Sequence, residues 1–170
     1  VDLNEVVVTA LGIERERKAL GYSVQKIDTR SINSVQETNV ANTLAGRVAG
    51  VQTTNGASGT GSSNRVVIRG ESFLSGSNQP LFVVDGMPIS NQMISNMTEN
   101  TESGFQEVDY GNGSAELSPA DIQSMTVLKG PGAAALYGSR AANGVIVINT
   151  KDGGYDQGTT IELNSTVTFE

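Results

Sequence analysis

The most enzyme-like pattern in the sequence is a glycine-rich turn after an apolar run. Gly130, Gly132 and Ala135 form a G-x-G-x-x-A pattern directly after SMTVLK, an arrangement that binds a dinucleotide pyrophosphate at a helix N-terminus. Pro131 removes one of the amides that a pyrophosphate needs, and Gly138 leaves only a few residues for the helix. The pattern therefore favours a structural turn over a nucleotide site.

The composition argues against most other catalytic chemistry. The 170 residues include no Cys and no His, which excludes thiolate nucleophiles, imidazole metal ligands and histidine-based triads. A paired-carboxylate glycosidase needs an apolar, usually aromatic-walled pocket, and the chain has four Phe, four Tyr and no Trp. We expect a protein that is not an enzyme.

Acidic side chains gather in one part of the chain. The net charge is -7, and the stretch between Arg69 and Lys129 has eight acidic residues and no basic one. This balance argues against a nucleic acid partner. Such a run is most often a solvated loop face, and the alternative is a calcium site with a spacing unlike an EF-hand loop. The candidate ligands are Asp109, Asn112, Glu116 and Asp121. Apart from this ion, no cofactor is expected.

The helices that the sequence predicts are short. Apolar residues at helical spacing over 39–51 predict a helix that ends at Gly50. A second short helix is expected over 133–137. Ser118 followed by Pro119 is typical of a helix N-terminus, with Ser118 as the cap.

The strands are predicted from β-branched runs and turn residues. The runs over 65–70, 124–129 and 145–150 indicate strands, and the first places two arginines on one face. Asp85 and Gly86 between two apolar stretches predict a tight hairpin. Together with the helices, this predicts an α+β fold with a mixed sheet of about four strands, short helices and long loops.

The two ends of the chain differ from its middle. We divide the sequence into an N-terminal tether over 1–20, a domain over 21–152 and a linker with a strand over 153–170. The tether holds a β-branched run suited to strand pairing, and residues 160–170 alternate between apolar and polar faces. No signal peptide or membrane-spanning apolar run is evident. The chain is therefore a cytosolic protein, a mature form or a fragment.

Five motifs, in order along the chain, resemble one known family. They are EVVVTALG at 5–12, LAGRVAGVQ at 44–52, VVIRG at 66–70, PLFVVDGMPI at 80–89 and VLKGPGAAALYGSRAANGVIVINTK at 127–151. Together they resemble the plug domain of TonB-dependent outer-membrane transporters, in the SusC/RagA-like branch. The first motif resembles the Ton box.

The resemblance implies a gating plug inside a β-barrel, in the outer membrane, with the Ton box in the periplasm. The Ton box-like residues would add as a strand to the C-terminal domain of TonB, which then pulls on the plug. These residues are Glu5, Val6, Val7, Val8 and Thr9. The tail over 160–170 would be the first strand of the protein's own barrel. An ordinary edge strand is the alternative.

Further site residues follow from the same resemblance. Arg69, Lys129 and Arg140 would pair with barrel carboxylates and hold the plug shut, although internal pairing of the two arginines is nearly as good an explanation. A substrate-facing loop is expected to contain Phe73, Leu74, Ser75 and Asn78. The acidic stretch over 91–117 would face the same side.

The cargo implied by the resemblance is a glycan or a peptide, handled with a SusD-like surface lipoprotein. Two other functions stay open. One is the plug of a siderophore or cobalamin transporter, and the other is a soluble carbohydrate-binding module. The low aromatic content argues against the module, because sugar sites are usually built on aromatic platforms.

Overall fold

The structure is a computed structural model of the 170-residue chain. The structure describes residues 6–8, 14–16, 23–28, 39–56, 62–74, 77–92, 109–130 and 134–152. The tail predicted as a barrel strand, the linker before it and most of the acidic stretch lie outside these residues. Among the described helices, none has the length and apolar character that crossing a membrane requires.

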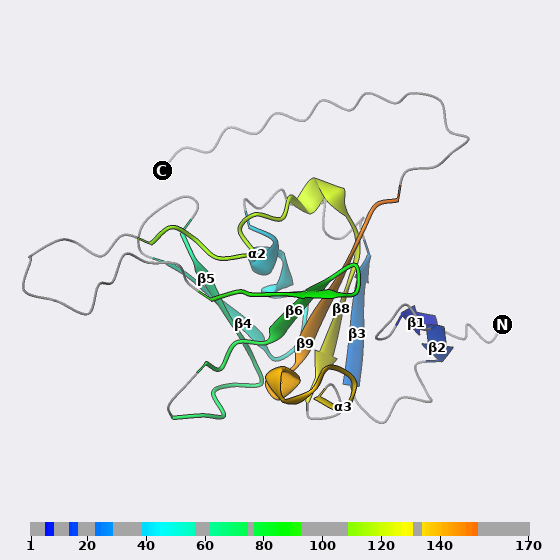
Figure 1. Cartoon of the computed structure of the whole chain (residues 1–170), viewed down its shortest axis with the longest axis horizontal. Helices are drawn as coiled ribbons and strands as arrows, with labels where there is room; N and C mark the ends of the chain where they lie inside the picture. Colours follow the sequence, from blue (N-terminus) through cyan, green and yellow to red (C-terminus); the bar gives the residue numbers. More distant parts are fainter. Residues whose placement is uncertain are drawn as a thin grey trace, which may run out of the picture.

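A five-stranded mixed sheet forms the centre of the fold (Figure 1). Its strand order is β3 (Ser23–Asp28), β8 (Ile122–Lys129), β9 (Val145–Thr150), β6 (Leu81–Val84) and β7 (Met87–Ile89). β8 is antiparallel to both of its neighbours, whereas β9 is parallel to β6. The predicted mixed sheet is confirmed, with five strands instead of about four.

Within this sheet, the strand that the sequence did not predict is β3, at one edge. Val24 and Ile27 are its buried residues, and the polar pair Gln25 and Lys26 separates them. This spacing does not follow the strict alternation of a half-buried strand. β3 is held by pairing with β8, from Ser23 opposite Lys129 to Asp28 opposite Ser124.

Apolar residues on the two faces of the sheet form two clusters. On one face, Met125, Val127 and Ile146 pack against α2 (Val40–Leu44) and against the separate hairpin of β4 (Val51–Asn55) and β5 (Asn64–Ile68). On the other face, Leu128, Val145 and Val147 pack with Ala141 and Tyr137. These two come from η6 (Ser139–Ala141) and α3 (Ala134–Tyr137). Burying one such side chain fully contributes about 1.5–3 kcal/mol.

The helix predicted over 39–51 is shorter than expected. Its N-cap is Asn39, whose Oδ1 accepts the amide of Ala41 at 2.9 Å. The helix ends at Leu44, not at Gly50, because Ala45 is extended and Gly46 adopts the left-handed conformation. The apolar periodicity still predicted the buried residues, which are Val40, Leu44, Val48 and Val51.

The turns around Ser118 and Asp85 test two further predictions. Pro119 begins a 3₁₀ turn, η4 (Pro119–Asp121), but Ser118 makes no side-chain cap bond, and β8 begins at Ile122 directly afterwards.

The hairpin at Asp85 and Gly86 is confirmed, since both residues have positive φ angles, as a type I′ turn requires. Asp85 also accepts the Thr150 amide at 2.9 Å and its hydroxyl at 2.7 Å, which ties the turn to the end of β9.

Replacing Gly144 with alanine should destabilise the fold more than replacing Gly46. Both glycines have positive φ, but a Cβ on Gly144 would lie 2.9 Å from the Leu128 carbonyl oxygen and 3.0 Å from Ile68 Cδ1, while Gly46 has open space. We expect Gly46→Ala to cost about 1–2 kcal/mol and Gly144→Ala a further ~1–3 kcal/mol from overpacking. Thermal unfolding of both variants measures the difference, and equal losses would contradict the close packing of β8 on Gly144.

Candidate functional site

The Ton box-like segment forms a short strand. β1 (Val6–Val8) pairs antiparallel with β2 (Glu14–Glu16), so that Val7 lies opposite Arg15. This two-stranded sheet is separate from the five-stranded one. The predicted extended conformation is confirmed for Val6, Val7 and Val8. Glu5 and Thr9 lie outside the described residues.

Lys129 is a buried cation at the end of β8. The residue is only 6% exposed. Its Nζ donates to Gln25 Oε1 at 2.9 Å and to the Ala49 carbonyl at 2.7 Å. Gln25 in turn donates its amide to the Arg47 carbonyl at 2.7 Å. These bonds join the sheet edge to the turns after α2.

Arg69 lies close to Lys129 but is exposed. It follows β5 with a φ of 61°, and its amide donates to the Gly50 carbonyl at 2.6 Å. A Cβ on Gly130 would lie 3.2 Å from Arg69 Nη1, which places the guanidinium beside the residue after Lys129. Burial lowers the pKa of Lys129, and repulsion by Arg69 lowers it further. Two of the three predicted lock residues therefore lie together.

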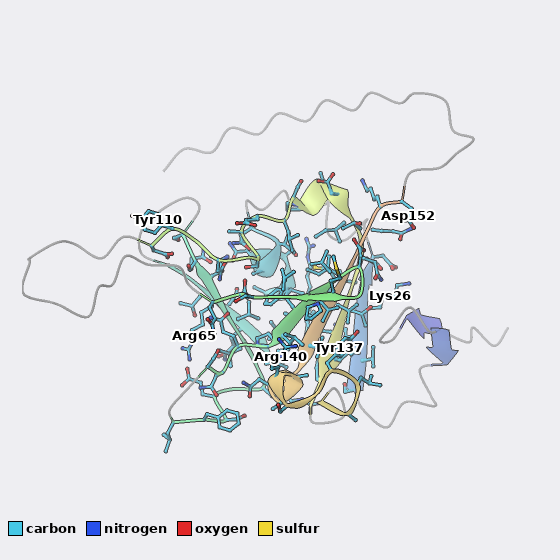
Figure 2. The ribbon with its side chains drawn as sticks, in the orientation of Figure 1. Lys26, Arg65, Tyr110, Tyr137, Arg140 and Asp152 are labelled. Atoms are coloured by element: carbon cyan, nitrogen blue, oxygen red, sulfur yellow. The ribbon has the colours of Figure 1, made fainter. Side chains whose placement is uncertain are left out.

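Two further arginines that the sequence singled out, Arg65 and Arg140, have other surroundings (both are labelled in Figure 2). Arg65 was expected to share a strand face with Arg69. β5 ends at Ile68, so Arg69 lies beyond the strand. Arg65 pairs with Glu71 at 2.6 Å. Arg140 belongs to η6 and lines a cavity on that side of the sheet. The structure thus brings Arg69 and Lys129 together and assigns Arg140 to another site.

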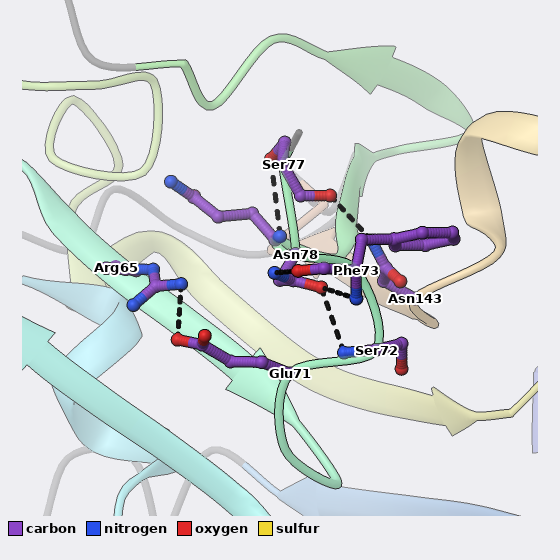
Figure 3. Close-up of polar contacts among 8 residues, drawn as sticks. Arg65, Glu71, Ser72, Phe73, Ser77, Asn78 and Asn143 are labelled. Carbon is purple, nitrogen blue, oxygen red and sulfur yellow. Dashed lines mark hydrogen bonds and ion pairs between the residues drawn. The ribbon is translucent and has the colours of Figure 1, made fainter. Parts of the chain in front are cut away.

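The predicted substrate loop is organised by one buried amide, shown in Figure 3. Asn78 Oδ1 accepts the amides of Ser72 at 3.0 Å and Phe73 at 2.8 Å, while its Nδ2 donates to the Phe73 carbonyl at 2.8 Å. Phe73 is half exposed and Leu74 fully exposed, whereas Asn78 is buried. Asn78 therefore supports the loop through its hydrogen bonds, and its expected contact with substrate stays a prediction. Ser75 lies outside the described residues.

Two of the candidate cation ligands tie loops together. Asp109 accepts the Ser63 hydroxyl at 2.6 Å, the Ser63 amide at 2.7 Å and the Gly111 amide at 2.8 Å. The Ser63 hydroxyl is the largest of the influences that lower the pKa of Asp109, and desolvation opposes them. Asn112 is buried and donates to the Asn64 carbonyl at 2.7 Å. Both side chains therefore hydrogen-bond to other residues of the domain.

The other two candidates are exposed. Glu116 and Asp121 lie at the surface, on either side of Ser118. Across the described residues, no three acidic side chains come close enough together to hold a metal ion. A calcium ion at these four positions has no geometric support from them.

The sequence reasoning missed the side-chain amides that hold the loops. Gln25 supports Lys129. Asn91 accepts the Ser114 amide at 2.8 Å and donates to Gln79 Oε1 at 2.9 Å, and Asn143 donates to the Ser77 carbonyl at 2.9 Å. The only signal in the sequence was the frequency of Asn in the loops, which says nothing about which residues are partners.

Comparisons with known proteins agree on one family. Residues 16–145 match the family described as TonB-dependent Receptor Plug Domain. The chain is 38% identical over 167 residues to the TonB-dependent receptor SusC of Bacteroides thetaiotaomicron, covering 98% of this chain and 15% of SusC. It is 32% identical over 157 residues to the ferric enterobactin receptor of Pseudomonas aeruginosa, covering 91% and 19% of the two chains.

A solved structure of the RagAB peptide importer in its open-open state is similar as well. The TM-score is 0.64 at 30% identity, over 91% of this chain and 15% of the other. The chain thus spans well under a quarter of the length of each of these relatives.

Removing the Lys129 ammonium should destabilise the domain, increasingly so at high pH. Lys129→Met leaves Gln25 Oε1 and the Ala49 carbonyl without a donor, at a cost of about 1–3 kcal/mol. Because the folded pKa is lowered, the unfolded wild type binds more protons between that pKa and the ordinary lysine value of about 10.4, so its stability rises with pH in this window. Lys129→Met lacks this rise.

Urea unfolding at pH 7 and pH 9.5 measures the effect. Lys26→Met, at an exposed position of β3, is the matched control and should follow the wild type. A gap between the wild type and Lys129→Met that shrinks with rising pH would contradict the burial of this cation.

Replacing Asn78 should loosen the loop over 72–78. Asn78→Ala removes all three bonds, and we expect a loss of about 1–3 kcal/mol and faster amide exchange at Ser72 and Phe73. Asn78→Asp keeps an acceptor for these two amides and should restore most of their protection. Hydrogen exchange followed by NMR measures both variants. Unchanged protection in Asn78→Ala would mean that the loop is held by other contacts.

Proposed function

The chain belongs to the TonB-dependent receptor plug domain family, and from this premise we propose that it is the gating plug of an outer-membrane transporter. The observation that carries this proposal is the match over 16–145, which includes β3, β6, β7 and β8 of the central sheet. In this role the plug blocks a barrel lumen until TonB pulls on it. Family membership favours this function over the soluble carbohydrate-binding module.

The gate would be opened through β1. A strand that already pairs with another strand has the backbone conformation needed to add to a sheet edge of the TonB C-terminal domain. The strand order supports this force path, because β3 is at the edge of the central sheet and is the sheet's first strand along the chain. Tension on residues 5–9 would therefore reach the plug through β3.

The closed state would be held by the pair Arg69 and Lys129. Two adjacent cations repel each other, and the two ion pairs among the described residues, Lys26–Asp28 and Arg65–Glu71, include neither of them. Barrel carboxylates near Arg69 would relieve this repulsion and favour the docked plug. Arg140, which lies in η6, is not part of this pair.

The cargo would be a peptide or a glycan, with a SusD-like lipoprotein as partner. The similarity to the RagAB peptide importer supports this class, as does the similarity to SusC. A siderophore cargo is the second candidate, supported by the ferric enterobactin receptor. A solved structure of that type of receptor from P. aeruginosa has a TM-score of 0.54 at 25% identity, below the 0.64 of RagAB. The peptide or glycan class is therefore preferred.

Binding to the TonB C-terminal domain tests the gate. Calorimetry with the 170-residue chain should give micromolar-range binding that Val7→Pro abolishes, because proline removes a backbone donor from β1. Absence of binding by the wild type would contradict the role of β1 as a Ton box.

Arg15→Pro is the matched variant on the opposite strand. Since Arg15 lies opposite Val7, this proline disrupts β2 and leaves β1 intact. If β2 competes with TonB for β1, binding should tighten by roughly threefold to tenfold, the equivalent of about one net hydrogen bond. Loss of binding in Arg15→Pro would instead mean that TonB recognises the paired hairpin.

A further inference from the structure

A cavity of about 590 Å³ lies between three segments of the plug. One wall is the loop that contains Phe73 and Gln79, the second is the chain leaving β7 up to Gln92, and the third is η6 with Arg140 and Asn143. The volume lies within the range of about 300–1,000 Å³ that is usual for small-molecule sites. None of the contacts described above for β1, Arg69 or Lys129 involves this cavity.

The walls are fixed to one another by side-chain amides. Asn143 donates to the Ser77 carbonyl at 2.9 Å, which joins the third wall to the first (Figure 3). Asn91 donates to Gln79 Oε1 at 2.9 Å and accepts the Ser114 amide, which joins the second wall to the first and to the next loop. Gly113 also packs so closely on the Ser90 carbonyl that a Cβ there would clash. The cavity is therefore formed before any ligand binds.

The charge of the cavity differs from that of the rest of the chain. Arg140 is exposed, and no Asp or Glu is among the described residues that line the cavity. Neither of the two ion pairs of the described residues involves Arg140. The described lining of the cavity therefore carries one positive charge and no negative one, in a chain with a net charge of -7.

The remaining lining residues suit a ligand with an apolar body. Phe73 is 50% exposed, and Leu81, Pro88 and Ile89 add aliphatic surface. Ser139 and Gln92 provide a hydroxyl and an amide next to this surface. A guanidinium binds a carboxylate through two parallel hydrogen bonds, which a single ammonium does not offer.

We propose that this cavity is a subsite for a carboxylate of the cargo, with Arg140 as its anchor and Phe73 against the adjacent apolar part. The carboxylate belongs either to the C-terminus of a short peptide or to a uronic acid of an acidic glycan, and Arg140 recognises the same group in both. The inference rests on the proposed function only in identifying the ligand as cargo. The cavity, its cation and its apolar wall are features of the plug alone.

An NMR titration of the ¹⁵N-labelled 170-residue chain tests the subsite. The probes are trialanine with a free C-terminus, its C-terminal amide, digalacturonate and the neutral disaccharide galactobiose. We expect at least one of the two acids to shift the amides of Ser139, Arg140 and Gln92, with its neutral counterpart at least about tenfold weaker, as expected for a hydrogen-bonded charge. Whichever acid binds identifies the source of the carboxylate.

Arg140→Gln and Arg65→Gln form a matched pair of variants. Both remove one exposed positive charge, but Arg65 pairs with Glu71 and does not line the cavity. Arg140→Gln should weaken acid binding at least about tenfold, while Arg65→Gln should stay within about twofold of the wild type. Overlaid spectra of the free variants check that both fold.

Several outcomes would overturn the proposal. They are the absence of shifts with both acids, equal binding of acids and neutral probes, and equal weakening in the two variants, which would indicate unspecific charge attraction. The titration contains no TonB, so its failure leaves the TonB-binding test unaffected. Conversely, if the chain binds the acids through Arg140 but does not bind TonB, the subsite proposal is supported and the role of β1 as a Ton box is contradicted.

Discussion

The fold depends on the pairing of β8 with strands on both sides. β8 is buried along nearly its whole length and is antiparallel to β3 and β9, so its residues alternate between the two apolar clusters of the domain. Met125 and Val127 face one cluster and Leu128 the other. Without this strand the two faces would lose their common support, because β3 has no other partner in the sheet and β6 is reached only through β9. The close approach of Gly144 to the Leu128 carbonyl is part of the same constraint.

The position of Lys129 follows from the end of β8. As β8 continues buried to its last residue, the lysine there is buried too, and its ammonium has to be satisfied locally by Gln25 and the Ala49 carbonyl. Burial lowers the pKa of Lys129, and repulsion by the neighbouring Arg69 lowers it further. A domain that keeps two adjacent cations at one end of its central strand is more stable next to anions than alone. This is the physical basis for proposing that the plug is held by carboxylates of a surrounding barrel.

Outside the sheet, side-chain amides hold the loops in place through hydrogen bonds to backbone groups. Asn78, Asn91 and Asn112 are buried, and each bonds to a backbone group of a loop or, for Asn112, of the first residue of β5. This arrangement suits a domain with a thin core, since a bond to a backbone amide fixes a loop without apolar surface. It also explains how a cavity with rigid walls is built from loops, with Arg140 and Phe73 as the groups it presents.

The sequence alone determined those features that depend on neighbouring residues. Two turn residues between apolar runs predicted the hairpin at Asp85 and Gly86, β-branched runs predicted β8 and β9, and the periodicity over 39–51 predicted the buried residues around α2 although not its end. The ordered motifs also indicated the family, and the match over 16–145 confirmed it. Only the tertiary structure decided which distant residues meet. Gln25 and Lys129 are 104 positions apart, and Ser63 and Asp109 are 46 apart. Such contacts are set by strand pairing and loop closure across the whole domain, and a local pattern in the sequence does not encode them.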